Sequence, residues 1–412
     1  MKGKWFVAFA ALMVVIVTGM TFFGCKNNSE NDGDDNENAE LRIENGVLVW
    51  CDWNAIYVKI PNGVTKIGDG AFKNHGKLYS VIIPSSVTSI GYEAFKGCSK
   101  LSSIEISNGV TSIGKEAFSE SCWYNSVSIS IPSSVTYIGD RAFSSSGITS
   151  VSIAEGVRSI GEEAFAGCFY MKSVEIPSSV ISIGSSAFRN CRDLTSIEIP
   201  GSVTAISRET FWGCNGLTSV SIAEGVTSIG EYAFINCSKL SSVSIASSVM
   251  SIGYAAFSGC SSLTSVEIPS NVTSIGEGAF SACGLTSVSI PNGIIGDEAF
   301  IGCKDLTSVS IENGVTSIGN SSFSDCYNLS SVEIPSSVTS IGDSAFYACV
   351  RLTSVSIPDS VRSIGQRAFL GCEKLKEIKF SGTKKQWENI ISEYGSGTYY
   401  ITIICTDGTI EK

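Results

Sequence analysis

The sequence predicts a repeat solenoid: a right-handed β/α solenoid, rich in β-structure, with a cap at each end. The motif Ile-Gly-x-x-Ala-Phe recurs about fourteen times at a spacing of about 23 residues, for example at residues 90–95 and 113–118, and last at 364–369. A cysteine usually follows three residues after the phenylalanine. A fixed period of this length is typical of solenoids, whose units contact only their neighbours and expose one long, shallow surface.

The first half of each unit predicts a half-buried strand. In the unit that begins at Leu217, the residues Leu217, Val220 and Ile222 follow the Leu-x-x-Leu-x-Leu spacing of leucine-rich repeats. Val220 and Ile222 alternate with serines, which indicates one buried and one exposed face. A Pro-x-Ser or Pro-Asn-Gly segment usually follows and predicts the turn that ends the strand.

The second half of the unit predicts a short extended piece and then an outer turn. Val226 and Ile229 are expected to point inward, and Gly230 permits a sharp bend. The Gly-x-x-Ala-Phe-x-x-Cys segment is interpreted as a short α-helical or 3₁₀ turn. Its predicted contributions to the core are Ala233, Phe234 and Cys237.

The solenoid is expected to span residues 63–380. Residues 41–62, which contain Trp50 and Trp53, are interpreted as an N-terminal β cap. Residues 381–412 form the expected C-terminal cap, with a helix over 383–393 and a strand over 399–405. Such caps are required because a single repeat cannot bury its own apolar face.

The amino terminus has the pattern of an export signal. Residues 1–24 combine two early lysines with an apolar stretch and are interpreted as a signal peptide. Cys25 is predicted to be the lipidated first residue of a membrane-anchored lipoprotein, although ordinary cleavage and an uncleaved anchor remain open. Residues 25–40 carry many acidic and few apolar side chains after the cysteine, which predicts a disordered acidic tether.

Composition excludes several classes of partner. The chain of 412 residues has a net charge of −11 and a single histidine. Phosphate binding needs lysines and arginines on one face, so no nucleic-acid partner is expected. The same charge disfavours an anionic membrane surface, and the only predicted membrane contact is the N-terminal lipid.

The cysteines are interpreted as structural thiols. Most of the fifteen occupy one position of the repeat, where neighbouring Cβ atoms point in parallel and disulfide geometry is poor. A buried free thiol behaves as a small apolar side chain. This ladder position includes Cys168, Cys191, Cys214, Cys237, Cys260, Cys283, Cys303, Cys326, Cys349 and Cys372.

We expect no enzymatic activity, no cofactor and no metal site. His75 falls at the cysteine position of the first repeat and is interpreted as a substituted ladder residue. Residues 109–115 resemble a phosphate-binding loop, but Glu116 replaces the required Ser or Thr, and the same segment recurs without its lysine. A metal site needs convergent ligands, which the cysteine ladder does not offer.

One exposed position of the long strand is the candidate binding face. It presents hydroxyl side chains interrupted by carboxylates. One interpretation is that these residues simply keep an exposed sheet soluble. The other is that they bind an extended basic or polar partner through many weak contacts. The exposed aromatic residues Trp123, Tyr124, Tyr170 and Trp212 are possible anchors. The candidate face consists of Glu105, Ser152, Glu175, Glu198, Ser221, Ser244, Glu267, Ser289, Ser310, Glu333 and Ser356, followed by Lys379.

The repeat Pro-x-Ser-Val-Thr-Ser-Ile-Gly-x-x-Ala-Phe-x-Gly-Cys-x-x-Leu-Thr-Ser-Val resembles the BspA-like class of bacterial leucine-rich repeats. The resemblance covers about residues 58–380 and extends to the Gly-Thr-Lys-Lys-Gln-Trp segment of the C-terminal cap. It implies an exported or surface-anchored protein, with an adhesin-like role toward host extracellular matrix or partner cells. It supplies no catalytic residues and no defined binding residues.

The sequence and the resemblance therefore predict a membrane-anchored lipoprotein at the cell surface or outer membrane that binds proteins through its repeats. Two alternatives remain. A structural or self-associating envelope protein would use the repeat face to bind copies of itself. A polysaccharide-active enzyme on a parallel β-helix would need Asp, Arg or Lys clustered on a few adjacent coils, whereas the repeats here are nearly interchangeable.

Overall fold

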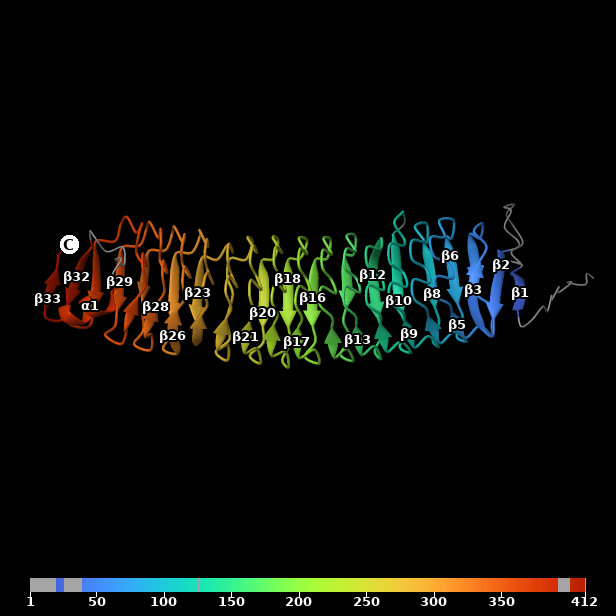
Figure 1. Ribbon diagram of the computed structural model, residues 1–412, viewed down its shortest axis with the longest axis horizontal. Coiled ribbons are helices and arrows are strands. Elements are labelled where there is room, and N and C mark those ends of the chain that lie inside the picture. The colour runs from blue at the N-terminus through green and yellow to red at the C-terminus, as the bar shows by residue number, and fades with distance from the viewer. Residues whose placement is uncertain (1–19, 26–38, 125, 392–400, 412) are drawn as a thin grey trace, which may run out of the picture.

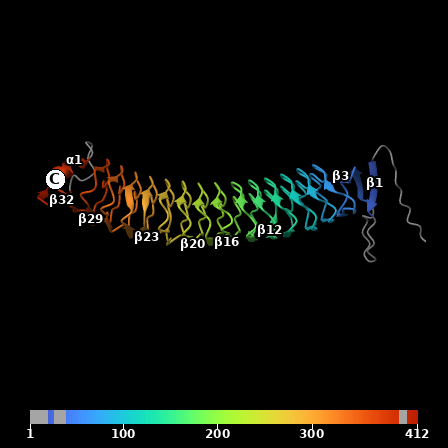
Figure 2. The same ribbon diagram turned by 90° about the horizontal axis from the view of Figure 1, so that it is seen from below.

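The protein is one long solenoid, as the sequence predicts. The computed structural model describes residues 20–25, 39–124, 126–391 and 401–411. Successive repeats stack in one row from the N-terminal to the C-terminal end, and the row is slightly curved (Figures 1 and 2). Almost all regular structure is β-strand, and the described residues contain one α-helix, which lies in the C-terminal cap.

The longer strand of each repeat pairs in parallel with the equivalent strands before and after it. Together these strands form what we call the long-strand face, in four consecutive sheets. The strands are β4 (Tyr57–Lys59), β6 (Ser80–Ile83) and β8 (Ser103–Ile106); β10 (Val127–Ile131), β12 (Ile148–Ile153) and β14 (Ser173–Glu175); β16 (Ser196–Ile199), β18 (Ser219–Ile222) and β20 (Ser242–Ile245); and β23 (Ser287–Ile290), β25 (Ser308–Ile311), β27 (Ser331–Glu333), β29 (Ser354–Ile357) and β31 (Glu377–Phe380).

The second extended piece of each repeat pairs in the same way and forms the short-strand face. Most of its strands are only two residues long, because the bend at the following glycine ends each one. They are β5 (Lys66–Ile67), β7 (Ser89–Ile90), β9 (Ser112–Ile113), β11 (Tyr137–Ile138), β13 (Ser159–Ile160) and β15 (Ser182–Ile183), then β17 (Ala205–Ile206), β19 (Ser228–Ile229), β21 (Ser251–Ile252), β22 (Ser274–Ile275), β24 (Gly293–Ile295), β26 (Val315–Ile318), β28 (Ser340–Ile341) and β30 (Ser363–Ile364).

The third side, the turn face, differs from the expected short α-helical or 3₁₀ turn, because it consists of separate turns. In the repeat at residues 91–98, the N–H groups of Glu93, Phe95 and Gly97 donate to carbonyls of the next repeat, at 2.7–3.0 Å. The N–H groups of the residues between them close local turns instead. A helix would have kept all these bonds within its own segment. Pairing between repeats therefore replaces the helix.

Two left-handed residues in each repeat make this arrangement possible. One is the second residue after the conserved glycine, as at Glu93 (φ 51°), and the other is the second residue after the phenylalanine, as at Gly97 (φ 71°). All fourteen described repeats have positive φ at both positions. A left-handed non-glycine residue costs about 1–2 kcal/mol, and the hydrogen bonds to the next repeat offset this cost.

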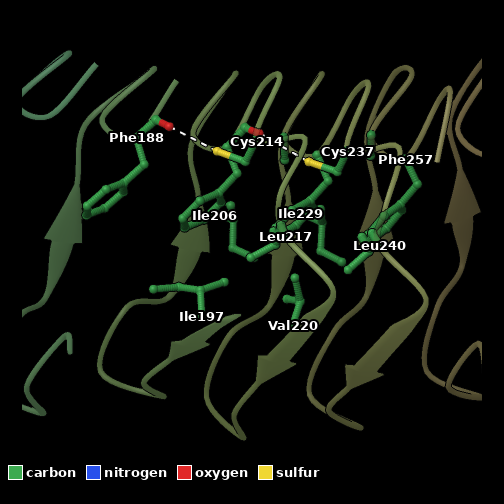
Figure 3. Close-up of a cluster of buried hydrophobic side chains, with 14 of the residues drawn as sticks. Phe188, Ile197, Ile206, Cys214, Leu217, Val220, Ile229, Cys237, Leu240 and Phe257 are labelled. Atoms are coloured by element: carbon green, nitrogen blue, oxygen red, sulfur yellow. Dashed lines mark hydrogen bonds between the residues drawn. The ribbon is translucent and has the colours of Figure 1, made fainter. Parts of the chain in front are cut away.

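The core consists of stacked ladders of identical side chains. Fourteen phenylalanines, from Phe72 to Phe369, stack with ring centroids 4.7–5.6 Å apart and ring planes within 11° of parallel. The predicted inward residues of the unit at Leu217 are all buried. Figure 3 shows these side chains pointing between the strands, with cysteines beside the phenylalanines. Each fully buried Phe, Ile or Leu contributes about 1.5–3 kcal/mol.

Both ends of the stack carry irregular elements. At the N-terminal end, β2 (Ala39–Glu44) and β3 (Val47–Cys51) form a hairpin that continues the short-strand face, and β1 (Met20–Cys25) pairs antiparallel with β2. At the C-terminal end, α1 (Lys384–Ile390) begins with a capping box between Thr383 and Gln386. The strands β32 (Thr402–Cys405) and β33 (Gly408–Ile410) then extend the long-strand face. Tyr399, expected to begin the last strand, lies outside the described residues.

Two departures from the 23-residue spacing change the loops before the long strands. Between Phe118 and Phe143 the chain has two extra residues, and between Phe143 and Phe165 it has one fewer. Loop 119–126 is consequently long, and loop 144–147 is short. A further short repeat lies between Phe280 and Phe300. The phenylalanine ladder continues through all of these positions, so the changes affect the surface and not the core.

Candidate functional site

The strand pairing brings the predicted face residues into one row along the long-strand face. Within the paired segments, Ser152 lies opposite Glu175, Glu198 opposite Ser221, and Glu333 opposite Ser356. All of the predicted residues are exposed except Ser356, which is half-buried. The row follows from parallel pairing without a register shift, which places equivalent positions side by side.

The row contains further residues that sequence reasoning missed. Ser130 lies opposite Ser152, Ile82 lies opposite Glu105, and Lys59 lies opposite Ile82. At the C-terminal end, Ile404 of β32 lies opposite Lys379. The alternation of buried and exposed residues could have identified them, since each lies between two inward-facing residues of its strand. Lys379 lies opposite Ser356. The row therefore presents hydroxyls and carboxylates over its central repeats, with one lysine and one isoleucine at each end.

Two shallow grooves of about 630 Å³ each lie on this face. The first groove is centred on Glu175 and Glu198, where the sheets end at β14 and begin again at β16. Pro177 and Pro200 form part of its lining. Neither Glu175 nor Glu198 forms an ion pair within the described ranges, so both carboxylates remain available to a partner.

The second groove repeats the same chemistry near the C-terminal end. It is lined by serines and two carboxylates, Glu312 and Glu333, with Pro335 and Pro358 at its edge. Ser289 and Ser310 donate hydrogen bonds to Glu312 at 3.4 Å and 2.7 Å. Neither groove lining includes a lysine or an arginine. Both grooves therefore favour cationic or hydrogen-bond-donating groups.

One carboxylate of the first groove has a structural role. Glu155 accepts hydrogen bonds from the hydroxyl and backbone N–H of Ser178 and from the backbone N–H of Ser179, at 3.0–3.2 Å. The Ser178 hydroxyl is the main cause that lowers the pKa of Glu155. Glu224 holds Ser247 and Ser248 in the same way. These glutamates fix the turn of the next repeat, and the row residues remain the ones that face solvent.

The four aromatic residues divide into two groups. Trp123, Tyr124 and Tyr170 are 39%, 76% and 49% exposed and line a common hollow at the edge of the long-strand face. Trp212 is half-buried on the turn face, with the Arg189 guanidinium 4.3 Å from its ring centroid. It also stacks with Tyr232. Trp212 is therefore packed, whereas the other three are open.

His75 and the cysteines are structural. His75 is buried; its Nε2 lies 2.6 Å from the Asp52 carbonyl, and its Nδ1 accepts from the Leu78 N–H. The fourteen cysteines from Cys51 onward are buried and form no disulfide within the described ranges. Burial raises the pKa of the Cys168 thiol to about 12. Thiols of this kind are poor nucleophiles at neutral pH.

The described residues contain no cluster of three or more His, Cys, Asp or Glu side chains arranged to hold a metal ion. Within the same ranges, no helix combines the length and hydropathy that a membrane span requires.

The comparisons with known proteins identify the family. The model of the BspA type leucine rich repeat region matches residues 42–169, 121–240, 182–295 and 293–404. The chain belongs to this family. The match extends over the whole solenoid and most of the C-terminal cap, which confirms the resemblance inferred from the repeat. No curated protein shows significant sequence similarity to the chain.

Solved structures of bacterial leucine-rich repeat proteins share the fold. A leucine-rich repeat protein of Bacteroides ovatus is 26% identical, with a TM-score of 0.66 over 95% of this chain and 100% of the other. The pneumococcal vaccine antigen PcpA is 18% identical, with a TM-score of 0.50 over 96% of this chain and 99% of the other. The second likeness concerns the fold alone. BspA-type relatives of this kind are typically surface proteins that bind other proteins.

Proposed function

We propose that the protein is an exported, lipid-anchored adhesion protein that presents its long-strand face to a host extracellular-matrix or partner-cell protein. The observation that carries this proposal is the row of exposed carboxylates and hydroxyls, which passes through two grooves without a basic lining residue. A rigid repetitive face of this kind suits a long partner better than a small molecule.

The charge of the face favours a basic or polar extended polypeptide. Glu175 and Glu198 lie on neighbouring repeats, close enough to act together on one lysine or arginine of a partner. An exposed ion pair contributes only about 0.2–1 kcal/mol. Useful affinity then requires several such contacts along the row, which the repeat supplies at a regular spacing.

The amino-terminal segment supplies the proposed attachment. Cleavage before Cys25 and lipidation of its thiol would hold the protein on the membrane, with residues 25–40 as a tether. Removal of residues 1–24 would also remove most of β1 and leave β2 as the edge strand of its sheet. Mass spectrometry of the protein as its natural host cell exports it tests this step, since a diacylated Cys25 is expected at the new terminus.

Solid-phase binding to a panel of extracellular-matrix proteins and partner cells, at physiological salt, tests the proposed function. We expect saturable binding that E175Q/E198Q weakens about tenfold. The matched control is E162Q/E277Q, which changes the net charge equally at two exposed glutamates of the turn face. Equal effects of both pairs would indicate a nonspecific charge effect and contradict the proposed site.

A structural or self-associating envelope protein is the alternative outcome. It would give no binding across the panel and a concentration-dependent assembly in analytical ultracentrifugation. The groove pair E175Q/E198Q would then change the assembly and not a heterologous interaction. A polysaccharide-active enzyme on a β-helix is disfavoured, because it would need Asp, Arg or Lys clustered on adjacent coils, and neither groove lining contains any of these residues.

A further inference from the structure

The hollow beside loop 119–126 is a site separate from the two grooves. It has a volume of about 300 Å³, and its walls carry Trp123 and Tyr124 on one side and Tyr170 on the other. Three large aromatic side chains in this hollow remain 39–76% exposed to water. A ligand that covers their apolar surface gains binding free energy from its burial. The regular repeat does not explain Tyr170, since outside this hollow no described repeat has an aromatic residue two positions after its ladder cysteine; Ser262 and Asp305 are examples of the residues at that position.

Unequal loop lengths create this hollow. Loop 119–126 has two extra residues, loop 144–147 of the next repeat is one residue short, and loop 166–172 follows; described residues of all three loops line the hollow. The two aromatic walls thus start two repeats apart, a separation of roughly 10 Å at about 4.8 Å per strand. Aromatic side chains from two separate repeats therefore line one hollow.

Backbone contacts hold the projecting loop in place. The N–H of Cys122 donates to the Cys98 carbonyl at 3.1 Å, and the N–H of Tyr124 donates to the Ser99 carbonyl at 3.3 Å. Gly147 passes so close beneath the loop that an added Cβ would lie 2.1 Å from the Cys122 carbonyl oxygen. These contacts show that the loop is supported by the repeats on both sides.

A second set of contacts orients the tryptophan. The Trp123 ring lies 6.4 Å from the Phe169 ring, centroid to centroid, and the Arg192 guanidinium covers Phe169 at 4.8 Å. Phe169 thus packs against Trp123 and is itself covered by Arg192, while part of the Trp123 side chain stays exposed. Preorganised aromatic walls bind with less loss of side-chain entropy than flexible ones.

The polar residues of the hollow indicate the ligand class. Lys172 and Asp193 line it, and neither side chain forms an ion pair in the part of the chain that the structure describes. One is a pure donor and the other a pure acceptor, whereas a hydroxyl both donates and accepts. Their charges cancel, so the hollow favours a neutral, hydroxyl-rich ligand. A phosphate-bearing ligand is disfavoured by Asp193, and a cationic ligand by Lys172.

We infer that this hollow is a saccharide-binding site, in which Trp123 and Tyr170 stack on the C–H faces of a sugar ring and Lys172 and Asp193 bind its hydroxyls. A sugar ring combines apolar C–H faces with a hydroxyl rim, which matches aromatic walls and a donor–acceptor pair. The inference does not rest on the proposed protein-binding role, because it concerns different residues and a different surface. The two sites would allow one molecule to bind a glycan and the polypeptide that carries it.

Screening of the full protein on an array of neutral oligosaccharides, including lactose, N-acetyllactosamine and manno- and xylo-oligosaccharides, tests the inference. The strongest ligand is then titrated by isothermal titration calorimetry, because tryptophan fluorescence would sum the signals of all six tryptophans. We expect W123A and Y170A to weaken binding at least tenfold, D193N to weaken it severalfold, and Y170F to retain it because the phenyl ring still stacks. The control Y92A removes a tyrosine of similar exposure, 45%, on the turn face.

The possible outcomes are distinguishable. Saccharide binding that Y170A abolishes and E175Q/E198Q leaves unchanged supports the site, whether or not a protein partner is found. Binding of no array member overturns the inference, as does equal weakening by Y92A and Y170A. A proline-rich peptide or a single-stranded oligonucleotide that binds the hollow more tightly than every saccharide would also overturn it. Circular dichroism of each variant confirms that the surface substitutions leave the fold intact.

Discussion

At the scale of single residues, the ladder cysteine combines apolar burial with one weak hydrogen bond. The Cys214 thiol donates to the carbonyl of Phe188 at 3.1 Å, and ten other cysteines bond an earlier phenylalanine in the same way (Figure 3). Serine could make this bond, but its hydroxyl is costlier to bury than a thiol. Alanine would leave the carbonyl without this donor. Cysteine satisfies both requirements.

The same burial predicts how the thiols respond to pH. Desolvation raises the pKa of Cys122 to about 11 and of Cys168 and Cys372 to about 12, against about 9 when unfolded. Their protonated form is favoured in the folded state, so this contribution to stability is complete below pH 9 and is lost as the pH rises through 11–12. We expect the fourteen described cysteines to be inert to a thiol reagent such as dithiobis(nitrobenzoate) at pH 8, and to react together after addition of guanidinium chloride. Rapid reaction of several of them in the native protein would contradict this.

At the scale of the turns and ladders, hydrogen bonds between a glycine and a serine link adjacent repeats. The N–H of Gly225 donates to the Ser248 hydroxyl of the next repeat, and that hydroxyl donates to the Val226 carbonyl. Gly225 also approaches the preceding repeat, because an added Cβ would lie 2.3 Å from the Gly201 carbonyl oxygen. The glycine is thus required both by its φ of 111° and by the close approach.

Two glycine substitutions distinguish the effect of the positive φ from the effect of the close approach to the preceding repeat. Gly63 has a similar φ of 99° and donates to Ser86 in the same way, but an added Cβ there would meet nothing within 4 Å. We expect Gly63→Ala to lower the free energy of unfolding by about 1 kcal/mol through strain alone, and Gly225→Ala to lower it by about 2 kcal/mol more. Urea unfolding followed by circular dichroism measures both. Equal losses would show that the close approach adds nothing.

A chain of charges links the first repeats on the turn face. Glu93 accepts hydrogen bonds from Lys73 and Lys96, and Lys96 also donates to Glu116 at 2.6 Å. The Glu93 side chain is only 10% exposed. The hydrogen bond from Lys73 is the main cause that lowers the pKa of Glu93 to about 2, from about 4.5 when unfolded. The chain therefore ties together three repeats next to the N-terminal cap.

The Glu93 carboxylate makes this end of the stack acid-sensitive. Because its folded pKa is the lower one, its contribution to stability is present above pH 4.5 and is lost as the pH falls toward 2. We expect Glu93→Gln to cost about 1–2 kcal/mol at pH 7 and little at pH 2. Thermal unfolding of both proteins across this range measures the difference. The exposed Glu277→Gln serves as control, and a pH-independent gap between wild type and Glu93→Gln would contradict the assignment.

The limits of sequence-based prediction also lie at this scale. The alternation around Val220 and Ile222 predicts the long-strand face and its row, because side-chain period and burial are local properties. The turn face is predicted as a short α-helical or 3₁₀ turn. Local i→i−3 hydrogen bonds are present there, but the bonds to the next repeat separate them into single turns, and the sequence does not reveal those bonds. The aromatic hollow depends on loop 119–126 being long where the next loop is short. Trp123, Tyr124 and Tyr170 were singled out as exposed aromatics, but only the stacking brings them to one site.

At the scale of the whole molecule, the stack places three candidate binding surfaces in a fixed order. The aromatic hollow lies nearest the N-terminal end, the first groove follows at Glu175 and Glu198, and the second groove lies near the C-terminal cap at Glu333. Every repeat between the grooves is held to its neighbours by the phenylalanine ladder, so the distance between the grooves is set by the number of repeats. A partner that engages both grooves must match that distance.

Deletion of residues 217–262 tests this geometry. The deletion removes two full repeats and joins Gly216 to Leu263 at equivalent positions, which leaves both grooves and the hollow intact. Since each repeat contacts only its neighbours, we expect a folded protein with cooperative unfolding and a smaller denaturant m-value, in proportion to the lost buried surface. Saccharide binding should be unchanged.

Binding of the protein partner then distinguishes two modes of recognition. A partner distributed along the row loses only the contacts of Ser221 and Ser244 and should bind severalfold more weakly. A partner that spans both grooves with a rigid segment should lose most of its affinity, because the effective concentration of the second contact falls steeply when the spacing is wrong. A partner confined to one groove should be unaffected, and E175Q/E198Q in the shortened protein would then identify which groove it uses.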